Sequence, residues 1–337
     1  MTDVATAHAE FERPEGLLAR LQGQLHSRAL LGPLLVLLLS ITAFSIIADN
    51  FFELSNFSLM LQQIMVFAIL GVGQTLVILT SGVDLSVGAT MTFSMMVMAK
   101  MSAEGHNSAL ALSAGFLLGL LGGLINGFFI TKMRLQPFIV TLATLYVFKS
   151  LSLWYSESAS VRLDDIAAAV KWTGKTFTLF DTKLPYGVVM MLVLFAIMSY
   201  SLRHTAWGRH VYAVGDDREA ARLAGIRVNR VLVSVYAITG LLCALAGWVL
   251  IGRSGGDPQA VTKDYNLLSI VFVVIGGTSL FGGRGRVVGT LLGALTYQVF
   301  YIGLPLAGVD DIWRDFAVGI LILAAVTIDM WVRRVSK

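Results

Sequence analysis

The stretch Asp216-Asp217-Arg218-Glu219-Ala220-Ala221-Arg222-Leu223-Ala224-Gly225-Ile226 is the longest polar helix pattern in a chain that is otherwise mostly apolar. Aspartates at its front can cap free backbone N–H groups, the Glu-Ala-Ala run favours a helix, and Gly225 suits a left-handed C-terminal cap. Positively charged loops of membrane proteins stay in the cytoplasm, and six arginines surround this stretch: Arg203, Arg209, Arg218, Arg222, Arg227 and Arg230. The pattern therefore predicts a short, exposed cytoplasmic helix between two apolar segments, with an irregular loop as the alternative.

The composition places the rest of the chain in a membrane. Of the 337 residues, 56% are hydrophobic and 14% are charged, and the mean hydropathy is +0.76. A water-soluble domain of this size could not keep such a surface solvated. The net charge is +4, but the informative feature is the side of the apolar segments on which the positive charges lie. The basic net charge therefore does not indicate nucleic-acid binding. The single cysteine, Cys243, lies in an apolar segment and is expected to be a small buried side chain.

Ten apolar segments predict an all-α, polytopic membrane protein with about ten transmembrane helices and both termini in the cytoplasm. They fall at about 29–48, 58–79, 87–101, 109–130, 137–155, 185–202, 231–251, 267–281, 287–304 and 314–332. The first is too long for a signal peptide and is interpreted as an uncleaved span. Segments 87–101 and 267–281 are short for the ~20 residues that a bilayer requires, so we expect tilted or broken helices there. The expected organisation is a cytoplasmic segment 1–28, one transmembrane domain 29–332 with its polar loop at 203–230, and a cytoplasmic tail 333–337.

The charges between the segments agree with this topology. Most of the lysines and arginines fall in the loops assigned to the cytoplasm, as the positive-inside rule requires. Acidic residues gather in the opposite loops, where one long connection, 156–184, is expected to cover the outer mouth without forming a domain. We therefore expect Lys132, Arg209, Arg284 and Arg334 in the cytoplasm, and Lys171, Asp257 and Asp311 on the periplasmic side.

Polar side chains inside the spans are the candidates for a transport pathway. Asp84 lies in a glycine-flanked break between two apolar segments, and a carboxylate at membrane depth costs ~2.5–3.5 kcal/mol, so it should face a cavity, a cap or a partner. The alternative is that Asp84 or Ser86 simply caps the next helix. A transported solute must also be released, which favours hydroxyls and amides over charges along its path. The candidate pathway residues are Gln74, Asp84, Ser86, Asn126, Thr141 and Thr144.

Two sets of glycines predict close helix packing. Gly115, Gly119, Gly123 and Gly127 recur every four residues on one face of the segment 109–130. Gly289 and Gly293 repeat the spacing in 287–304. Faces of small residues let two helix backbones approach closely in a membrane, so we expect packing and no chemistry from them.

No pattern in the sequence supports an enzyme. Gly174-Lys175-Thr176 lacks the earlier glycine of a phosphate-binding loop, because position 169 is Ala169. The glycines at 283, 285 and 289 are not preceded by a strand pattern, which a dinucleotide site needs. The five histidines have no metal-ligand spacing. The sequence predicts no catalytic residue, metal or cofactor.

The spacing from Glu219 to Gly225 resembles the EAA loop of the membrane subunits of ATP-binding-cassette (ABC) importers. Four further stretches make most of the chain similar to the ribose-type branch of these permeases, within the branched binding-protein-dependent transport permease family: 73–88, 136–144, 208–215 and 275–285. Position 81 is a departure, since Ser81 stands where the family more often has glycine.

The resemblance implies a permease subunit of the bacterial inner (plasma) membrane that works as a homodimer. Its implied partners are an ATP-binding cassette subunit, which hydrolyses the ATP, and a periplasmic sugar-binding protein, which delivers a monosaccharide, a pentose or hexose such as ribose or fructose. Glu219, Ala220, Ala221 and Gly225 would form the coupling helix that docks into a cleft of the ATPase, with the two alanines giving a small surface for close approach. Loop 203–230 would then be the coupling loop.

A second class of function is an ion-coupled secondary transporter of a small polar solute. Such a transporter would need acidic residues near the middle of its spans to hold the coupling ion. Only Asp84 and Asp329 come close, and both lie near predicted span ends. Uptake of sugar by the purified chain without ATP or partner subunits would favour this alternative.

Overall fold

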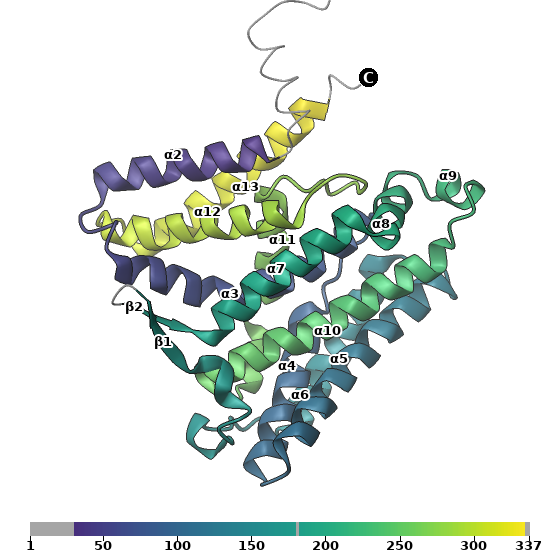
Figure 1. The fold of residues 1–337 in the computed structure, drawn as a ribbon, viewed down its shortest axis with the longest axis horizontal. Coiled ribbons are helices and arrows are strands. Elements are labelled where there is room, and N and C mark those ends of the chain that lie inside the picture. The colour runs from purple at the N-terminus through teal and green to yellow at the C-terminus, as the bar shows by residue number, and fades with distance from the viewer. Residues whose placement is uncertain (1–29, 180–181, 334–337) are drawn as a thin grey trace, which may run out of the picture.

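The computed structural model describes residues 30–179 and 182–333, and nearly all of its regular structure is helical (Figure 1). The α-helices are α2 (Leu31–Ile47), α3 (Leu54–Leu79), α4 (Val87–Ala103), α5 (Ser108–Thr131), α6 (Pro137–Tyr155), α7 (Tyr186–His204), α8 (Ala206–Asp216), α9 (Arg218–Leu223), α10 (Val228–Ser254), α11 (Tyr265–Ile275), α12 (Val287–Leu306) and α13 (Asp311–Arg333). Each of the ten apolar segments coincides with one helix. The expected segment 1–28 and residues 334–337, including Arg334, lie outside the described residues.

Six of the described helices are long and apolar enough to cross a membrane: α3, α5, α6, α7, α10 and α12. Helices α2 and α11 are apolar but shorter. Helix α11 ends at Ile275, six residues before the expected end of that segment. The chain turns there because Gly276 and Gly277 follow, and Gly277 has a left-handed φ of 76°.

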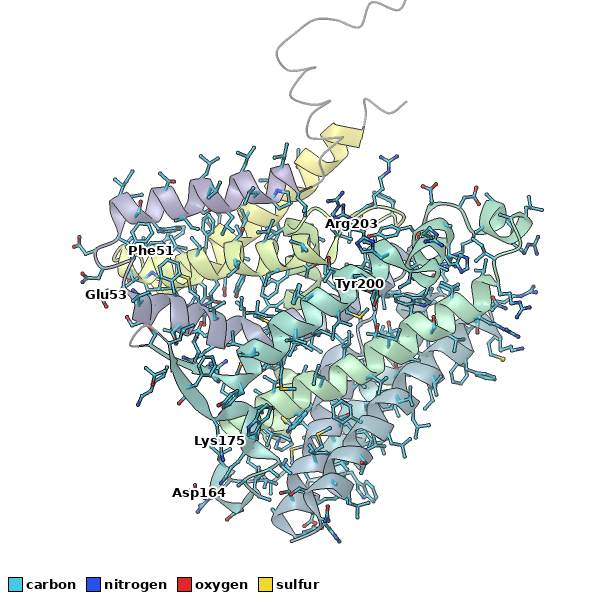
Figure 2. All side chains as sticks on the ribbon, viewed as in Figure 1. Phe51, Glu53, Asp164, Lys175, Tyr200 and Arg203 are labelled. Carbon is cyan, nitrogen blue, oxygen red and sulfur yellow. The ribbon has the colours of Figure 1, made fainter. Side chains whose placement is uncertain are left out.

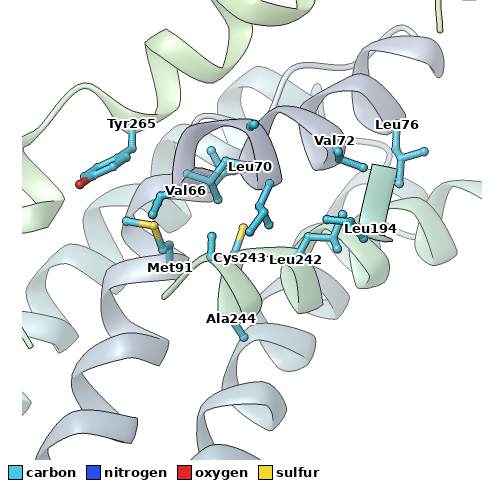
Figure 3. Close-up of a cluster of buried hydrophobic side chains, with 14 of the residues drawn as sticks. Val66, Leu70, Val72, Leu76, Met91, Leu194, Leu242, Cys243, Ala244 and Tyr265 are labelled. Carbon is cyan, nitrogen blue, oxygen red and sulfur yellow. The ribbon is translucent and has the colours of Figure 1, made fainter. Parts of the chain in front are cut away.

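The core of the molecule is built around α3 and α10. In their most apolar 18-residue windows, 78% of α3 and 72% of α10 is buried, against 28% for α5 and α6. Figure 3 shows Leu242 and Cys243 of α10 facing Leu70 and Val72 of α3 across this core. Cys243 is 2% exposed, which confirms that it is a small buried side chain. The other helices thus surround α3 and α10, and their own outer faces are apolar and exposed.

Glycines let α5 lie directly against α10, and the two helices run side by side in Figure 1. A Cβ added at Gly123 would lie 2.1 Å from the Tyr236 carbonyl oxygen, and one at Gly119 would lie 2.4 Å from that of Gly240. Because real Cβ atoms do not approach a carbonyl so closely, each position requires glycine. The packing role predicted for this face is confirmed, and the α5–α10 pair forms a tight seam.

The same device joins α11 to α12. A Cβ at Gly289 would lie 2.2 Å from the Gly276 carbonyl oxygen, and one at Gly293 would lie 2.1 Å from that of Phe272. Helix α12 also packs on α2 through a separate apolar cluster that includes Phe44 and Ile302. In Figure 1, α2, α12 and α13 form a layer on one side of α3. The packing predicted for these two glycines is therefore confirmed as well.

The connection 156–184 contains more regular structure than the sequence predicted. It holds two 3₁₀ turns, η1 (Leu163–Asp165) and η2 (Lys171–Gly174), and the antiparallel strands β1 (Thr176–Leu179) and β2 (Thr182–Pro185). This hairpin is an addition to a fold that is mostly helical, as predicted. A Cβ at Gly174 would lie 1.7 Å from the Gly252 carbonyl oxygen, so this glycine allows η2 to pack on the end of α10.

Candidate functional site

Within the predicted stretch 216–226 the structure has one short helix, α9, and a second helix, α8, comes directly before it. Helix α8 begins at Thr205, whose Oγ1 accepts a hydrogen bond from the Gly208 N–H at 3.2 Å. The chain breaks after Asp216, and Asp217 caps α9 by accepting bonds from Glu219 N at 2.8 Å and Ala220 N at 3.0 Å. The sequence missed α8 because its pattern is amphipathic and not apolar. Within 216–226 the predicted cap residues are confirmed, since Asp217 caps the start and Gly225 follows the end with φ 84°.

Helix α9 projects from the rest of the molecule at one end (Figure 1). Glu219, Ala220 and Gly225 are exposed, and the Leu223 side chain is 84% exposed. Ala221 is only 4% exposed and belongs to the buried core. The expectation that Ala220 and Ala221 share one accessible surface was therefore wrong, because neighbouring residues of a helix point in different directions. Sequence reasoning also passed over Leu223, an apolar side chain on an otherwise polar tip.

The start of α9 is hydrogen-bonded to the connection between α3 and α4. Arg218 Nη2 donates a hydrogen bond to the Thr80 carbonyl oxygen at 2.9 Å. The single Ser81 Oγ–H is shared between two carbonyl oxygens, of Gly215 at 3.0 Å and of Phe281 at 2.9 Å. Ser81 has a left-handed φ of 59°, the conformation that explains why a glycine would also suit this turn. The hydroxyl of Ser81 offsets that backbone strain by binding two other segments.

A third connection, between α11 and α12, meets the other two. Gly283 N donates to the Leu79 carbonyl oxygen at 3.0 Å. A Cβ at Gly215 would lie 1.7 Å from that same oxygen, so the end of α8 approaches α3 as closely as a backbone can. We call this meeting point of Leu79, Ser81, Gly215, Arg218 and Gly283 the inner junction. The sequence could not reveal it, because its members come from distant parts of the chain.

All six candidate pathway residues lie in one hydrogen-bonded group, which we call the polar cluster: Gln74, Asp84, Ser86, Asn126, Thr141 and Thr144. The Ser86 N–H and Oγ–H both donate to Asp84 Oδ1, at 2.8 and 2.6 Å. The Asn126 amide donates to Ser86 Oγ at 2.9 Å and accepts from Thr144 Oγ1 at 2.8 Å. The cluster therefore joins the connection 80–86 to α5 and α6.

The two remaining members hold the backbone of the same connection. Gln74 Nε2 donates to the Asp84 carbonyl oxygen, and Thr141 Oγ1 donates to that of Val83 at 3.2 Å. All six side chains are buried. The carboxylate of Asp84 thus organises the turn before α4 and is held by neighbours. Ser86 is the residue before α4 but makes no side-chain cap bond, so the capping alternative is not confirmed. In this conformation the polar groups of the cluster bind one another.

The residues described in the structure offer no constellation for catalysis. Among them, no group of three or more His, Cys, Asp or Glu side chains could hold a metal ion. The site consists instead of three parts that are connected by hydrogen bonds. They are the exposed helix α9, the inner junction and the buried polar cluster, in order from the surface toward the core.

The fold and this site define a multi-pass helical membrane protein with a small polar helix at one end. A family profile described as branched-chain amino acid transport system / permease component matches residues 56–326. The chain belongs to this family of ABC transporter permeases. It is a multi-pass protein of the bacterial inner membrane and a transport subunit, not an enzyme, since in this family the ATPase is a separate subunit.

Several relatives align along nearly the whole chain. The fructose import permease protein FrcC of Rhizobium meliloti is 45% identical over 99% of this chain and 94% of its own length. The ribose import permease protein RbsC of Escherichia coli K12 is 39% identical over 88% of this chain and 92% of its own. The autoinducer 2 import system permease protein LsrC of Photorhabdus luminescens is 29% identical over 85% of each.

A solved structure shares the fold. It is described as an inward-facing conformation of an ABC transporter of metal-chelate type. The TM-score is 0.51, with 15% sequence identity, and the likeness covers 90% of this chain and 99% of that one. The helical arrangement is therefore that of an ABC transporter permease.

Proposed function

We propose that this chain is the transmembrane permease subunit of an ATP-driven importer that moves a monosaccharide, a pentose or hexose, from a periplasmic binding protein into the cytoplasm. The observation that carries the proposal is the 45% identity to a fructose import permease over 99% of the chain. The ribose import permease of E. coli supports the same substrate class. The functional unit would contain this chain, a second permease copy, ATP-binding cassette subunits and the binding protein.

The proposed topology has ten spans with both termini in the cytoplasm, a permease domain over 29–332, and cytoplasmic ends at 1–28 and 333–337. The arrangement of the helices supports it, because connections assigned to the same side meet. The connections after α3, α8 and α11 form the inner junction. At the other side, Val161 pairs with Gly256, which joins two connections assigned to the periplasm.

Helix α9 is the proposed docking element for the ATPase. Glu219, Ala220, Leu223 and Gly225 give it an accessible surface, whereas Ala221 would act from within by packing α9 on the permease core. A conformational change of the ATPase that moves α9 would be transmitted to the connection 80–86 through the hydrogen bond from Arg218 to the Thr80 carbonyl oxygen. From there the polar cluster continues to α5 and α6. We propose that these helices shift when the cluster exchanges its hydrogen bonds, which opens the route for the sugar.

Reconstitution in liposomes tests the proposal. The chain is co-purified with its ATPase, and the vesicles receive the binding protein and radiolabelled fructose or ribose. We expect uptake that requires both ATP and the binding protein. Uptake without either component would instead indicate an ion-coupled secondary transporter, and a lack of uptake of every pentose and hexose would contradict the proposed substrate class.

A further inference from the structure

A basic hollow lies between the end of α7, the helix α8 and the start of α12. Its volume is about 460 Å³, and it opens to the outside of the molecule. Three arginines line it, Arg203 from α7, Arg209 from α8 and Arg286 from the residue before α12. None of the coupling or polar-cluster residues takes part in it. We call it the arginine hollow.

The arginine hollow carries three positive charges that the described part of the chain does not pair. Among the side chains that the structure describes, no carboxylate forms an ion pair with any of the three guanidinium groups. Like charges that line one small hollow repel each other, so a bound anion would stabilise them. Guanidinium groups match the oxygens of a phosphate with paired N–H donors, which makes a phosphate the anion best suited to this site.

The walls of the hollow are shaped by fixed groups. Tyr212 reaches across it and donates a hydrogen bond from its hydroxyl to the Gly285 carbonyl oxygen at 2.8 Å. Burial raises the pKa of the Tyr212 phenol, and the positive charge of Arg286 opposes that rise. The N-terminus of α12 has no side-chain cap, and its first residues, Val287 and Val288, line the hollow. The bond from Tyr212 thus fixes one wall of the hollow, and the arginines supply its hydrogen-bond donors.

Its position is the boundary of the apolar layer. Arg203 lies in the last turn of α7, and Arg286 directly precedes α12, so both cations lie where a spanning helix meets the charged face. Figure 2 shows Arg203 and Tyr200 near this end of α7, away from Lys175 and Asp164 at the other end of the molecule. The Tyr200 side chain is 65% exposed, as is typical of tyrosines in the belt at a membrane surface.

Apolar side chains complete the site. Leu202 and Val287, both buried, and Val288, which is 37% exposed, form one wall of the hollow, and Leu30 and Ser199 also line it. An apolar wall does not stabilise a free phosphate ion. A phospholipid bound by its phosphate can instead pack its first acyl carbons against this wall. Basic pockets between spanning helices on the cytoplasmic side are suited to the headgroups of anionic lipids. We propose that the arginine hollow binds the phosphate of an anionic phospholipid, with the lipid chains lying along the outer faces of α7 and α12.

Native mass spectrometry of the full chain tests this inference. Protein purified in neutral detergent is transferred into nanodiscs that contain phosphatidylglycerol and phosphatidylcholine. The protein is then released from the nanodiscs in the mass spectrometer, and the lipids still bound to it are counted. We expect one retained phosphatidylglycerol per chain. In the double variant Arg209→Gln and Arg286→Gln, retention should fall on the order of tenfold or more, since each arginine near a membrane surface contributes to lipid affinity. The matched control is Arg227→Gln with Arg230→Gln, which removes the same charge from another part of the same face and should keep the lipid.

Two results would overturn the proposal. Equal retention of phosphatidylglycerol by the wild type and the hollow variant would show that the lipid binds elsewhere. Inorganic phosphate is the second probe, added to the protein in neutral detergent while its melting temperature is followed. If phosphate raises the melting temperature of the wild type but not of the hollow variant, while both proteins retain phosphatidylglycerol equally, the site binds free phosphate and not a lipid.

Discussion

The residue that most directly connects α9 to the core is Arg218. Its hydrogen bond to the Thr80 carbonyl is charge-assisted, and because Arg218 is exposed we expect it to contribute only ~1 kcal/mol to stability. Replacement with glutamine should therefore leave insertion and co-purification with the ATPase unchanged. Sugar-stimulated ATP hydrolysis should fall several-fold, because movement of α9 no longer pulls the connection 80–86.

The control for Arg218→Gln is Lys132→Gln, which removes the same charge from another exposed connection. It should retain the activity of the wild type in the same ATPase assay. A normal rate in Arg218→Gln would show that the stroke reaches the core by another route.

Asn126 is the centre of the polar cluster, since its side chain bonds to both Ser86 and Thr144. Replacement with alanine leaves two buried hydroxyls without this partner, which costs about 1–3 kcal/mol. We expect a lower melting temperature in detergent and reduced sugar uptake. Thr144→Val removes one of the two bonds and should have a smaller effect on both. A melting temperature of Asn126→Ala equal to that of the wild type would mean that the cluster reorganises without loss.

At the scale of single elements, the C-terminal cap of α9 allows a test that separates backbone strain from packing. No atom of the described chain lies within 4 Å of a Cβ added at Gly225, so a substitution there meets only the backbone strain of its φ of 84°. Valine should cost ~1–2 kcal/mol and disturb the tip, whereas asparagine tolerates this conformation. We expect Gly225→Val to insert normally but to co-purify poorly with the ATPase and to lose sugar-stimulated hydrolysis.

Gly225→Asn is the matched control and should behave like the wild type. Ala220→Trp adds bulk to the exposed surface without backbone strain and should also weaken co-purification. Ala221→Trp cannot serve as an interface probe, because its side chain is buried in the permease itself. If Gly225→Val and Ala220→Trp both transport sugar at the wild-type rate, α9 only connects α8 to α10 and does not dock the ATPase.

The positions of the apolar helices could be predicted because long apolar runs are local, but some of their ends could not. Pro137 begins α6 as predicted, whereas α11 ends at Ile275, directly before Gly276 and six residues before its predicted end. Helix α8 and the β1–β2 hairpin were missed, because short amphipathic and polar elements give no apolar run. The candidate pathway residues were chosen one by one for their chemistry. That they form one cluster depends on tertiary contacts, such as that between Asn126 and Ser86, which no local pattern contains.

At the scale of the whole molecule, the topology can be tested by cysteine labelling in intact cells. Cys243 is first replaced by serine, and single cysteines are placed at Lys132, Arg209, Arg284, Lys171 and Asp257. Lys132 directly follows α5, Arg209 lies in α8, and Arg284 lies in the connection before α12, whereas Lys171 and Asp257 lie in the connections before α7 and after α10. A membrane-impermeant maleimide that enters the periplasm should label only positions 171 and 257. Labelling at 209 would invert the proposed orientation.

The central place of α3 has a consequence for the making of the protein. Thr75 of α3 bonds to Thr290, 215 positions later, and the Gly73 carbonyl accepts from Thr239, 166 positions later. At roughly 5–20 residues per second, α3 is synthesised about 10–40 s before its last partner exists. During that interval Thr75 can use the carbonyl of Gly71 in its own helix, at 2.7 Å, but Gln74 has no such partner until the chain reaches Asp84. The nascent chain can thus form its first polar contacts locally, whereas the contacts of α3 with α10 and α12 form only after those later helices have been synthesised.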